Sequence, residues 1–158
     1  MSRNTKSGLE FFPVDIDIDQ DDKVYYIVGQ CGEIAFGRLL KLLAEIYRAG
    51  YYKLWTEEEE IIFAGKKGIP LPELRTMVAA ALHKRFFDPG LYERFQVLTS
   101  VGIQRRYLIA AERRKHLSMH QELLLVSPSE LSPKAQKALQ IAVGDIIPLN
   151  AAKAGPNA

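Results

Sequence analysis

A short segment that contains glycine and proline, Gly65 to Pro72, separates two stretches of the chain with helical periodicity. Before it, Thr56 and Glu59 form a capping box, which places the start of a helix there. After it, Pro72 falls in the first turn of a second helix, where a missing backbone N–H is tolerated. The segment between them leaves room only for a tight turn. The sequence therefore predicts a helix-turn-helix.

Other segments have the periodicity or the caps of helices. The clearest begins near Phe36, where apolar residues recur at three- and four-residue steps, and Gly50 follows it as a C-terminal cap. Near the end of the chain's first two thirds, Ser100 is a typical N-cap. The expected helices cover residues 21–28, 36–47, 56–65, 72–84 and 100–117.

Strands are expected between these helices. Residues 15–19 alternate with period two, as a half-buried strand or an extended arm does, and residues 51–55 are rich in aromatic side chains. Residues 86–87 are expected to pair with residues 96–98 across a turn at 88–90, which would form a wing.

The order of elements predicts a mainly α fold with a small β-hairpin, a winged helix-turn-helix. We expect this domain to cover residues 9–118, with an extended N-terminal arm at residues 9–21. The composition after Pro128 is rich in Ser, Pro, Ala and Lys. It predicts a flexible tail at residues 119–158, with a weak helix at residues 134–143.

Charge is unevenly distributed along the 158 residues, although the net charge is only +2. Residues 1–60 carry 7 basic and 12 acidic side chains, whereas residues 61–126 carry 11 basic and 5 acidic ones. Such an asymmetry indicates a basic surface for an acidic partner, or head-to-tail self-association.

Apolar runs fall well short of the roughly 20 residues that a membrane span requires. The first residues do not lead into the apolar core of a secretory signal, and the single cysteine excludes an internal disulfide. We therefore expect a cytoplasmic protein that does not associate with a membrane.

The residues that catalysis or metal binding would need do not assemble into a known pattern. Cys31 has no activating base near it in the sequence, and the glycines at 65 and 68 lack phosphate-loop spacing. An EF-hand loop counted from Asp15 would need Gly and Glu where Gln20 and Tyr26 stand. We expect no enzyme activity, no cofactor and no bound metal.

Basic residues in the second half are the candidates for contact with DNA. Arg106 and Arg113 would share one face of the last helix and hold phosphates there, unless that face is only solvated. On the second helix of the pair, Arg75 is able to reach a guanine, but Ala79 and Ala80 give the face few groups for reading bases. We therefore expect phosphate-led binding with little sequence preference. The candidate residues are Lys66, Lys67, Arg75, Thr76, His83, Lys84, Arg85, Arg94, Arg105, Arg106, Arg113, Arg114 and Lys115.

Residues 11–115, about two thirds of the chain, resemble a known family. It is the N-terminal domain shared by phage and mobile-element proteins related to the DnaD primosome protein. The similar stretches are Phe12-Pro13, Asp17-Ile18-Asp19, Asp22-Lys23, residues 46–52 with Trp55, residues 87–93 and residues 98–107.

This resemblance implies a winged helix and a role in DNA replication, in loading or organising replication proteins. In the DnaD relatives this domain is implicated in self-association, and a further C-terminal domain carries much of the DNA contact. About forty residues follow Leu117, and we therefore expect no such second domain within this sequence. The expected partners are DNA, replication proteins and a second copy of the chain. The alternative is an interaction or self-association module that does not contact DNA.

Overall fold

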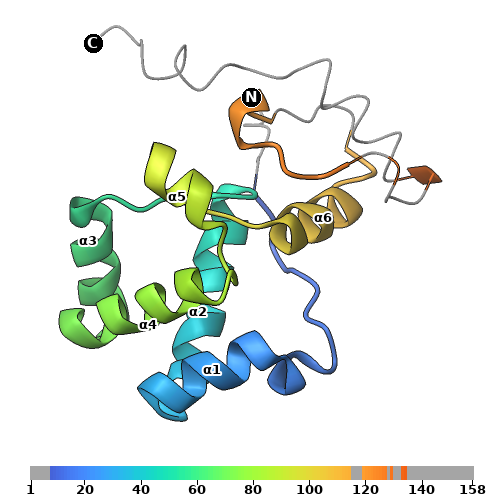
Figure 1. Cartoon of the computed structure of the whole chain (residues 1–158). Helices are drawn as coiled ribbons and strands as arrows, with labels where there is room; N and C mark the ends of the chain where they lie inside the picture. The colour runs from blue at the N-terminus through green and yellow to red at the C-terminus, as the bar shows by residue number, and fades with distance from the viewer. Residues whose placement is uncertain (1–7, 115–118, 128, 130–132, 135–158) are drawn as a thin grey trace, which may run out of the picture.

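The computed structural model describes residues 8–114 and 119–127, together with residues 129, 133 and 134. This part of the chain is mainly helical and contains a two-stranded antiparallel sheet (Figure 1). The longer helices are α1 (Asp22–Cys31), α2 (Ile34–Ala49), α3 (Glu57–Lys67), α4 (Leu71–His83), α5 (Pro89–Phe95) and α6 (Val101–Ala110). The strands are β1 (Lys53–Leu54) and β2 (Val97–Leu98), and the short 3-10 helices are η1 (Ile18–Gln20) and η2 (Gln121–Leu123).

Side-chain caps begin three of the helices. The sequence predicts Thr56 and Ser100 in this role, and for the first helix it offers Asp21 and Asp22 as alternatives, of which the structure uses Asp21. The Asp21 carboxylate accepts a hydrogen bond from the Lys23 backbone N–H at 2.8 Å at the start of α1. Thr56 caps α3 through the backbone N–H of Glu59, and Ser100 caps α6 through that of Ile103. These bonds satisfy amide groups that a helix start otherwise leaves without a partner.

The tight turn between α3 and α4 is also confirmed. Gly68 ends α3 with a φ of 64°, in the left-handed region that favours glycine. Two residues later Pro70 precedes α4, and Pro72 lies in its first turn. The helix-turn-helix segment therefore forms as the sequence predicts.

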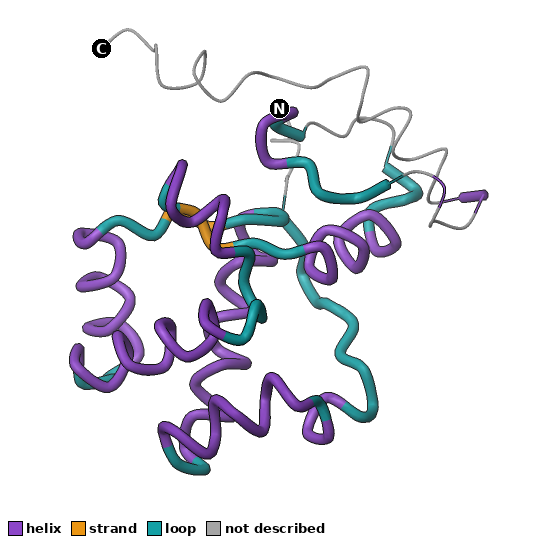
Figure 2. The backbone as a smooth tube through the Cα atoms, in the orientation of Figure 1, coloured by secondary structure: helices purple, strands orange, loops and turns teal. Residues whose placement is uncertain are grey.

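The expected pairing of residues 86–87 with residues 96–98 is wrong. Strand β2 pairs with β1, and Figure 2 shows the two side by side. In this pairing Leu98 lies opposite Lys53. The segment between residues 87 and 96 forms the helix α5. It begins there because Asp88 accepts a hydrogen bond from the Leu91 N–H and Pro89 occupies the first helical turn. The wing expected from that pairing is thus absent from the described residues.

Of the two forms expected for residues 15–19, a half-buried strand or an extended arm, the strand does not form. The Ile18 N–H donates to the Asp15 carbonyl at 3.1 Å, which makes a turn that leads into η1. Ile16, one of the apolar residues of the alternating pattern, is 99% exposed. The alternating pattern alone does not form a strand, since a strand needs a partner to pair with. The sheet of the described chain consists of β1 and β2, and neither pairs with residues 15–19.

The core continues beyond residue 118, where the sequence predicts a tail. Met119, Leu123 and Val126 are buried against the helices. The Gln104 side chain of α6, itself fully buried, donates to the Leu123 carbonyl at 2.7 Å and accepts from the Leu125 N–H at 2.8 Å. Residues 119–126 therefore belong to the packed structure. The expected helix at 134–143 lies almost wholly outside the described residues.

Helix α6 ends at Ala110, earlier than predicted, and a turn follows in which the Arg114 N–H bonds to the Ala111 carbonyl. Within the described residues, no helix is long and apolar enough to cross a bilayer.

Replacing Gln104 by Met should remove both bonds to the C-terminal segment while keeping the side chain's volume. Leaving a buried N–H and carbonyl without partners should lower the free energy of unfolding by about 2 kcal/mol, measured by urea denaturation. Gln121→Met, an exposed glutamine in the same segment, is the matched control and should change little. Equal effects of the two changes would contradict this account.

Candidate nucleic-acid interface

The charged side chains in the first half of α4 are paired with opposite charges of the same chain. A helix-turn-helix protein would place this part of the helix in the major groove. Arg75 forms an ion pair with Glu60 at 2.7 Å and a longer one with Glu57 at 3.6 Å, both across to α3. On the other side Glu73 pairs with Arg38 of α2 at 2.9 Å. The guanidinium expected to reach a guanine is therefore held by two carboxylates of its own chain.

The remaining outward residues of α4 offer few polar groups. The Thr76 hydroxyl donates to the Pro72 carbonyl of its own helix at 2.9 Å, and Ala79 is exposed. Ala80, which we expected on this face, is 7% exposed and belongs to the core. This side-chain inventory is poor in the donors and acceptors that discriminate between base pairs.

The C-terminal end of α4 has the opposite character. The Lys84 ammonium lies 5.4 Å from the centroid of the Tyr26 ring, and the His83 ring centre lies 5.4 Å from the same ring. Tyr26 projects from α1, against which α4 packs extensively. A cation above an aromatic face is attracted by the ring's electron density, so these contacts hold basic groups at the surface.

Next to this cluster is a hollow of about 300 Å³, lined by Lys23, Arg85 and Arg106. These three cations come from α1, from the turn after α4 and from α6, whose first turn also lines the hollow. We call Lys23, His83, Lys84, Arg85 and Arg106, together with Tyr26, the basic corner.

Arg85 has a φ of 62°, which is uncommon for a residue with a side chain. This left-handed turn stops α4 and points the chain toward α5. Non-glycine residues in this conformation cluster at ligand-binding sites, and Arg85 brings a cation to the hollow.

Two carboxylates also line this hollow, but both are used as helix caps. Asp21 accepts from the Lys23 backbone and Asp88 from the Leu91 backbone. Among the described residues, Lys23, Lys84 and Arg85 form no ion pair. Their positive charges are thus available to an anion from outside the molecule.

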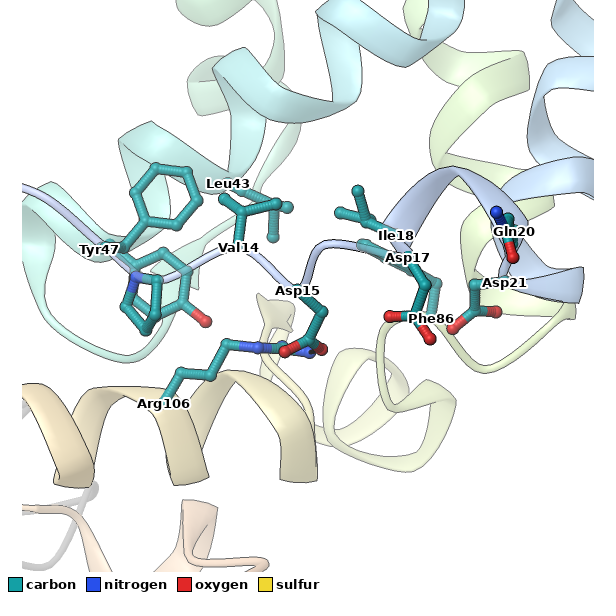
Figure 3. A pocket seen from close by; sticks show the side chains of 12 residues that line it. Val14, Asp15, Asp17, Ile18, Gln20, Asp21, Leu43, Tyr47, Phe86 and Arg106 are labelled. Carbon is teal, nitrogen blue, oxygen red and sulfur yellow. Dashed lines mark hydrogen bonds and ion pairs between the residues drawn. The ribbon is translucent and has the colours of Figure 1, made fainter.

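Arg106 differs from the other cations because the N-terminal arm already covers it. The Asp15 carboxylate accepts a hydrogen bond from the Arg106 guanidinium at 2.7 Å. Figure 3 shows the two side chains meeting, with Tyr47 nearby. Burial raises the pKa of the Tyr47 hydroxyl, and the neighbouring Arg106 charge partly opposes that shift. The guanidinium therefore joins the arm to the edge of the basic corner.

Other contacts hold the arm along α2. The Phe12 ring stacks on the Tyr47 ring with centroids 4.7 Å apart, and the Leu9 N–H donates to the Tyr47 carbonyl at 2.7 Å. At the start of the described chain, Arg114 donates to the Gly8 carbonyl at 2.6 Å. Gly8 lies so close to the Arg48 carbonyl that no side chain fits there.

The structure brings four of the predicted contact residues together in the basic corner: His83, Lys84, Arg85 and Arg106. The others lie elsewhere. Lys66 and Lys67 end α3, Arg94 stacks on Phe95 in α5, Arg105 and Arg114 are engaged in contacts within the chain, and Lys115 lies outside the described residues. Arg113 is exposed, but it does not share a helix face with Arg106 because α6 ends at Ala110.

Sequence reasoning missed Lys23, because it stands among acidic residues in a segment with negative net charge. Tyr26, which the structure half-buries, is likewise not among the predicted contact residues. The spacing of Lys23 and Tyr26 could have indicated that they lie together, because residues three apart in a helix share a face. This face is next to the one that carries the buried Val24 and Ile27.

Comparison with known proteins identifies relatives of the chain. Residues 11–103 match the family described as "Lin1244/Lin1753-like, N-terminal". The chain is similar to an uncharacterized phage-related protein, Lin1244/Lin1753, of Listeria innocua serovar 6a (strain ATCC BAA-680 / CLIP 11262). The two are 39% identical over 131 residues, which cover 83% of this chain and 43% of that protein. The chain therefore spans less than half the length of this relative. No solved structure matches the chain.

Phe12→Ala should loosen the arm, because it removes the ring that stacks on Tyr47. We expect the Leu9 amide to exchange its hydrogen roughly three- to tenfold faster, from the usual strength of an aromatic pair. Phe11→Ala is the matched control, since the neighbouring ring is 83% exposed. Unchanged exchange in the Phe12 variant would mean that the stack does not hold the arm.

Proposed function

This chain belongs to the Lin1244/Lin1753-like N-terminal family, and we propose that it binds the phosphate backbone of nucleic acid at the basic corner. The observation that supports this proposal is the convergence of cations from α1, from the turn after α4 and from α6 around one hollow. Lys23, Lys84 and Arg85 have no ion-pair partner among the described residues. Cations that neutralise phosphates release counterions from the nucleic acid, which provides binding energy without reading bases.

Little sequence preference follows from the same surface. The half of α4 that would read bases has its charged groups paired within the chain, at Arg75 and Glu73. Binding should therefore depend on α4's C-terminal end and be sensitive to salt. The aromatic ring of Tyr26 adds a surface against which Lys84 is held.

We further propose that the fold is a winged-helix variant in which α5 replaces one strand of the wing. The succession α2, β1, α3, α4, β2 and α6 supports this, with β1 pairing with the strand that follows α5. The resemblance to the N-terminal domain of DnaD supports a setting in DNA replication, where the chain would organise replication proteins on DNA.

The double change Lys23→Gln and Arg85→Gln tests the interface. We expect affinity for all duplex and single-stranded sequences to fall about tenfold, and the salt dependence to lose about two charges, in a fluorescence anisotropy titration. Lys41→Gln, at an exposed lysine of α2 that does not line the hollow, controls for the change of charge. Binding that survives the double change, or wild-type protein without binding at low salt, would refute the proposal.

Arg75→Gln separates phosphate binding from base reading. Because Arg75 is already paired with Glu60 and Glu57, we expect its loss to leave affinity for nucleic acid within about twofold of wild type. A helix that reads bases through Arg75 would instead lose about 1–3 kcal/mol and its preference at one position. The same titration with two unrelated sequences distinguishes these outcomes.

The alternative function is a module that docks a replication partner without contacting DNA. The neutral outward face of α4, with Thr76 and Ala79, supports it, because such a face packs readily against protein. Absence of any DNA binding at low salt would favour this second candidate.

A further inference from the structure

Helix α3 carries two large apolar side chains that the described structure covers only in part. Ile61 is 49% exposed and Ile62 is 42% exposed, and α3 lies at the periphery of the molecule (Figure 1). We propose that this face of α3 pairs with the same face of a second copy of the chain, antiparallel about a two-fold axis. This inference goes beyond nucleic-acid binding, because α3 contributes no residue to the basic corner.

The charges at the two ends of α3 identify a second copy as the occupant. The first turn contains four glutamates and the last turn two lysines. Three of the glutamates have a cation within the chain: Glu57 and Glu60 pair with Arg75, and Glu59 pairs with Lys53. Glu58 is the one of the four that forms no ion pair among the described residues.

The basic end of α3 is likewise available. Lys66 is exposed, and neither it nor Lys67 forms an ion pair with another described residue. The helix therefore offers an unpaired negative charge at one end and unpaired positive charges at the other. A second α3 that runs in the opposite direction presents the complementary charge at each end.

The spacing along α3 fits this arrangement. Glu58, Ile61, Ile62, Gly65 and Lys66 fall at the three- and four-residue steps that define one helix face. Ile62 is halfway between Glu58 and Lys66. A two-fold axis beside Ile62 therefore sets the isoleucines of the two copies together and places each Glu58 opposite the other copy's Lys66.

Gly65 allows the two helices to approach closely. No atom lies within 4 Å of the position that its Cβ would occupy, so this point of the surface is open. In the antiparallel pair Gly65 faces the stretch between Glu58 and Ile61 of the other copy. Small residues at a helix crossing let the backbones come together and increase the contact of the larger side chains.

The pair should be weak and dependent on concentration, because it relies on two isoleucines from each copy and on only two exposed ion pairs in the whole dimer. Sedimentation velocity of the wild-type chain over a wide concentration range should show a monomer–dimer equilibrium. Ile61→Asp together with Ile62→Asp should abolish it. Ile34→Asp, at an isoleucine of α2 that is 61% exposed, should leave it unchanged.

Charge reversal tests the antiparallel register directly. Glu58→Lys alone and Lys66→Glu alone should each weaken the dimer about tenfold, because each creates two repulsive pairs. The double variant should restore the affinity of the wild type. A wild-type chain that stays monomeric, an equilibrium that survives the isoleucine changes, or a double variant as weak as the single ones would overturn the proposal. These outcomes are independent of the nucleic-acid titration, so either proposal can fail alone.

Discussion

The hydrogen-bonded contact between residues 51–55 and 96–99 joins the two halves of the chain, and the basic corner depends on it. The Trp55 N–H donates to the Gln96 carbonyl at 2.7 Å, and the buried Thr99 hydroxyl donates to the Tyr51 carbonyl at 2.7 Å. The Asp88 N–H then donates to the Thr99 carbonyl at 2.8 Å, which draws the chain after α4 to the start of α6. Without this contact, the cations at the end of α4 and those of α6 would have no fixed relation. A buried polar network of this kind specifies one arrangement because an alternative would leave its groups without partners.

The distribution of ion pairs, more than the number of basic residues, decides where an anion can bind. Arg75 and Arg38 have charges as large as those of Lys84 and Arg85, but carboxylates of the same chain already offset them. Exposed pairs contribute little to stability. Their larger consequence here is to remove the positive charge from one end of α4 and leave it at the other. Two helices joined by a tight turn therefore keep their packing while the exposed first half of the second helix is neutral.

Local signals predicted what local physics determines, and long-range contacts decided the rest. The caps at Asp21, Thr56 and Ser100 act within one helical turn, so the sequence reveals them. Strand pairing is a long-range choice: residues 86–87 have suitable side chains, but the backbone of β1 takes the place beside β2. The same limit explains the predicted tail, because Met119 and its neighbours become buried only through contacts with α6 and the sheet region.

The site was predictable to a similar extent. His83, Lys84 and Arg85 are adjacent in sequence, so a basic cluster at the end of α4 could be expected from the sequence. The spacing of Lys23 and Tyr26 places the two on one face of α1, but only the packing of α1 against α4 brings Lys23 to the same hollow as Arg85. The pairing of Arg106 with Asp15, 91 positions earlier, is equally invisible in composition. It turns one strongly basic residue of α6 into an anchor for an acidic arm, so the arm and a phosphate would compete for the same guanidinium.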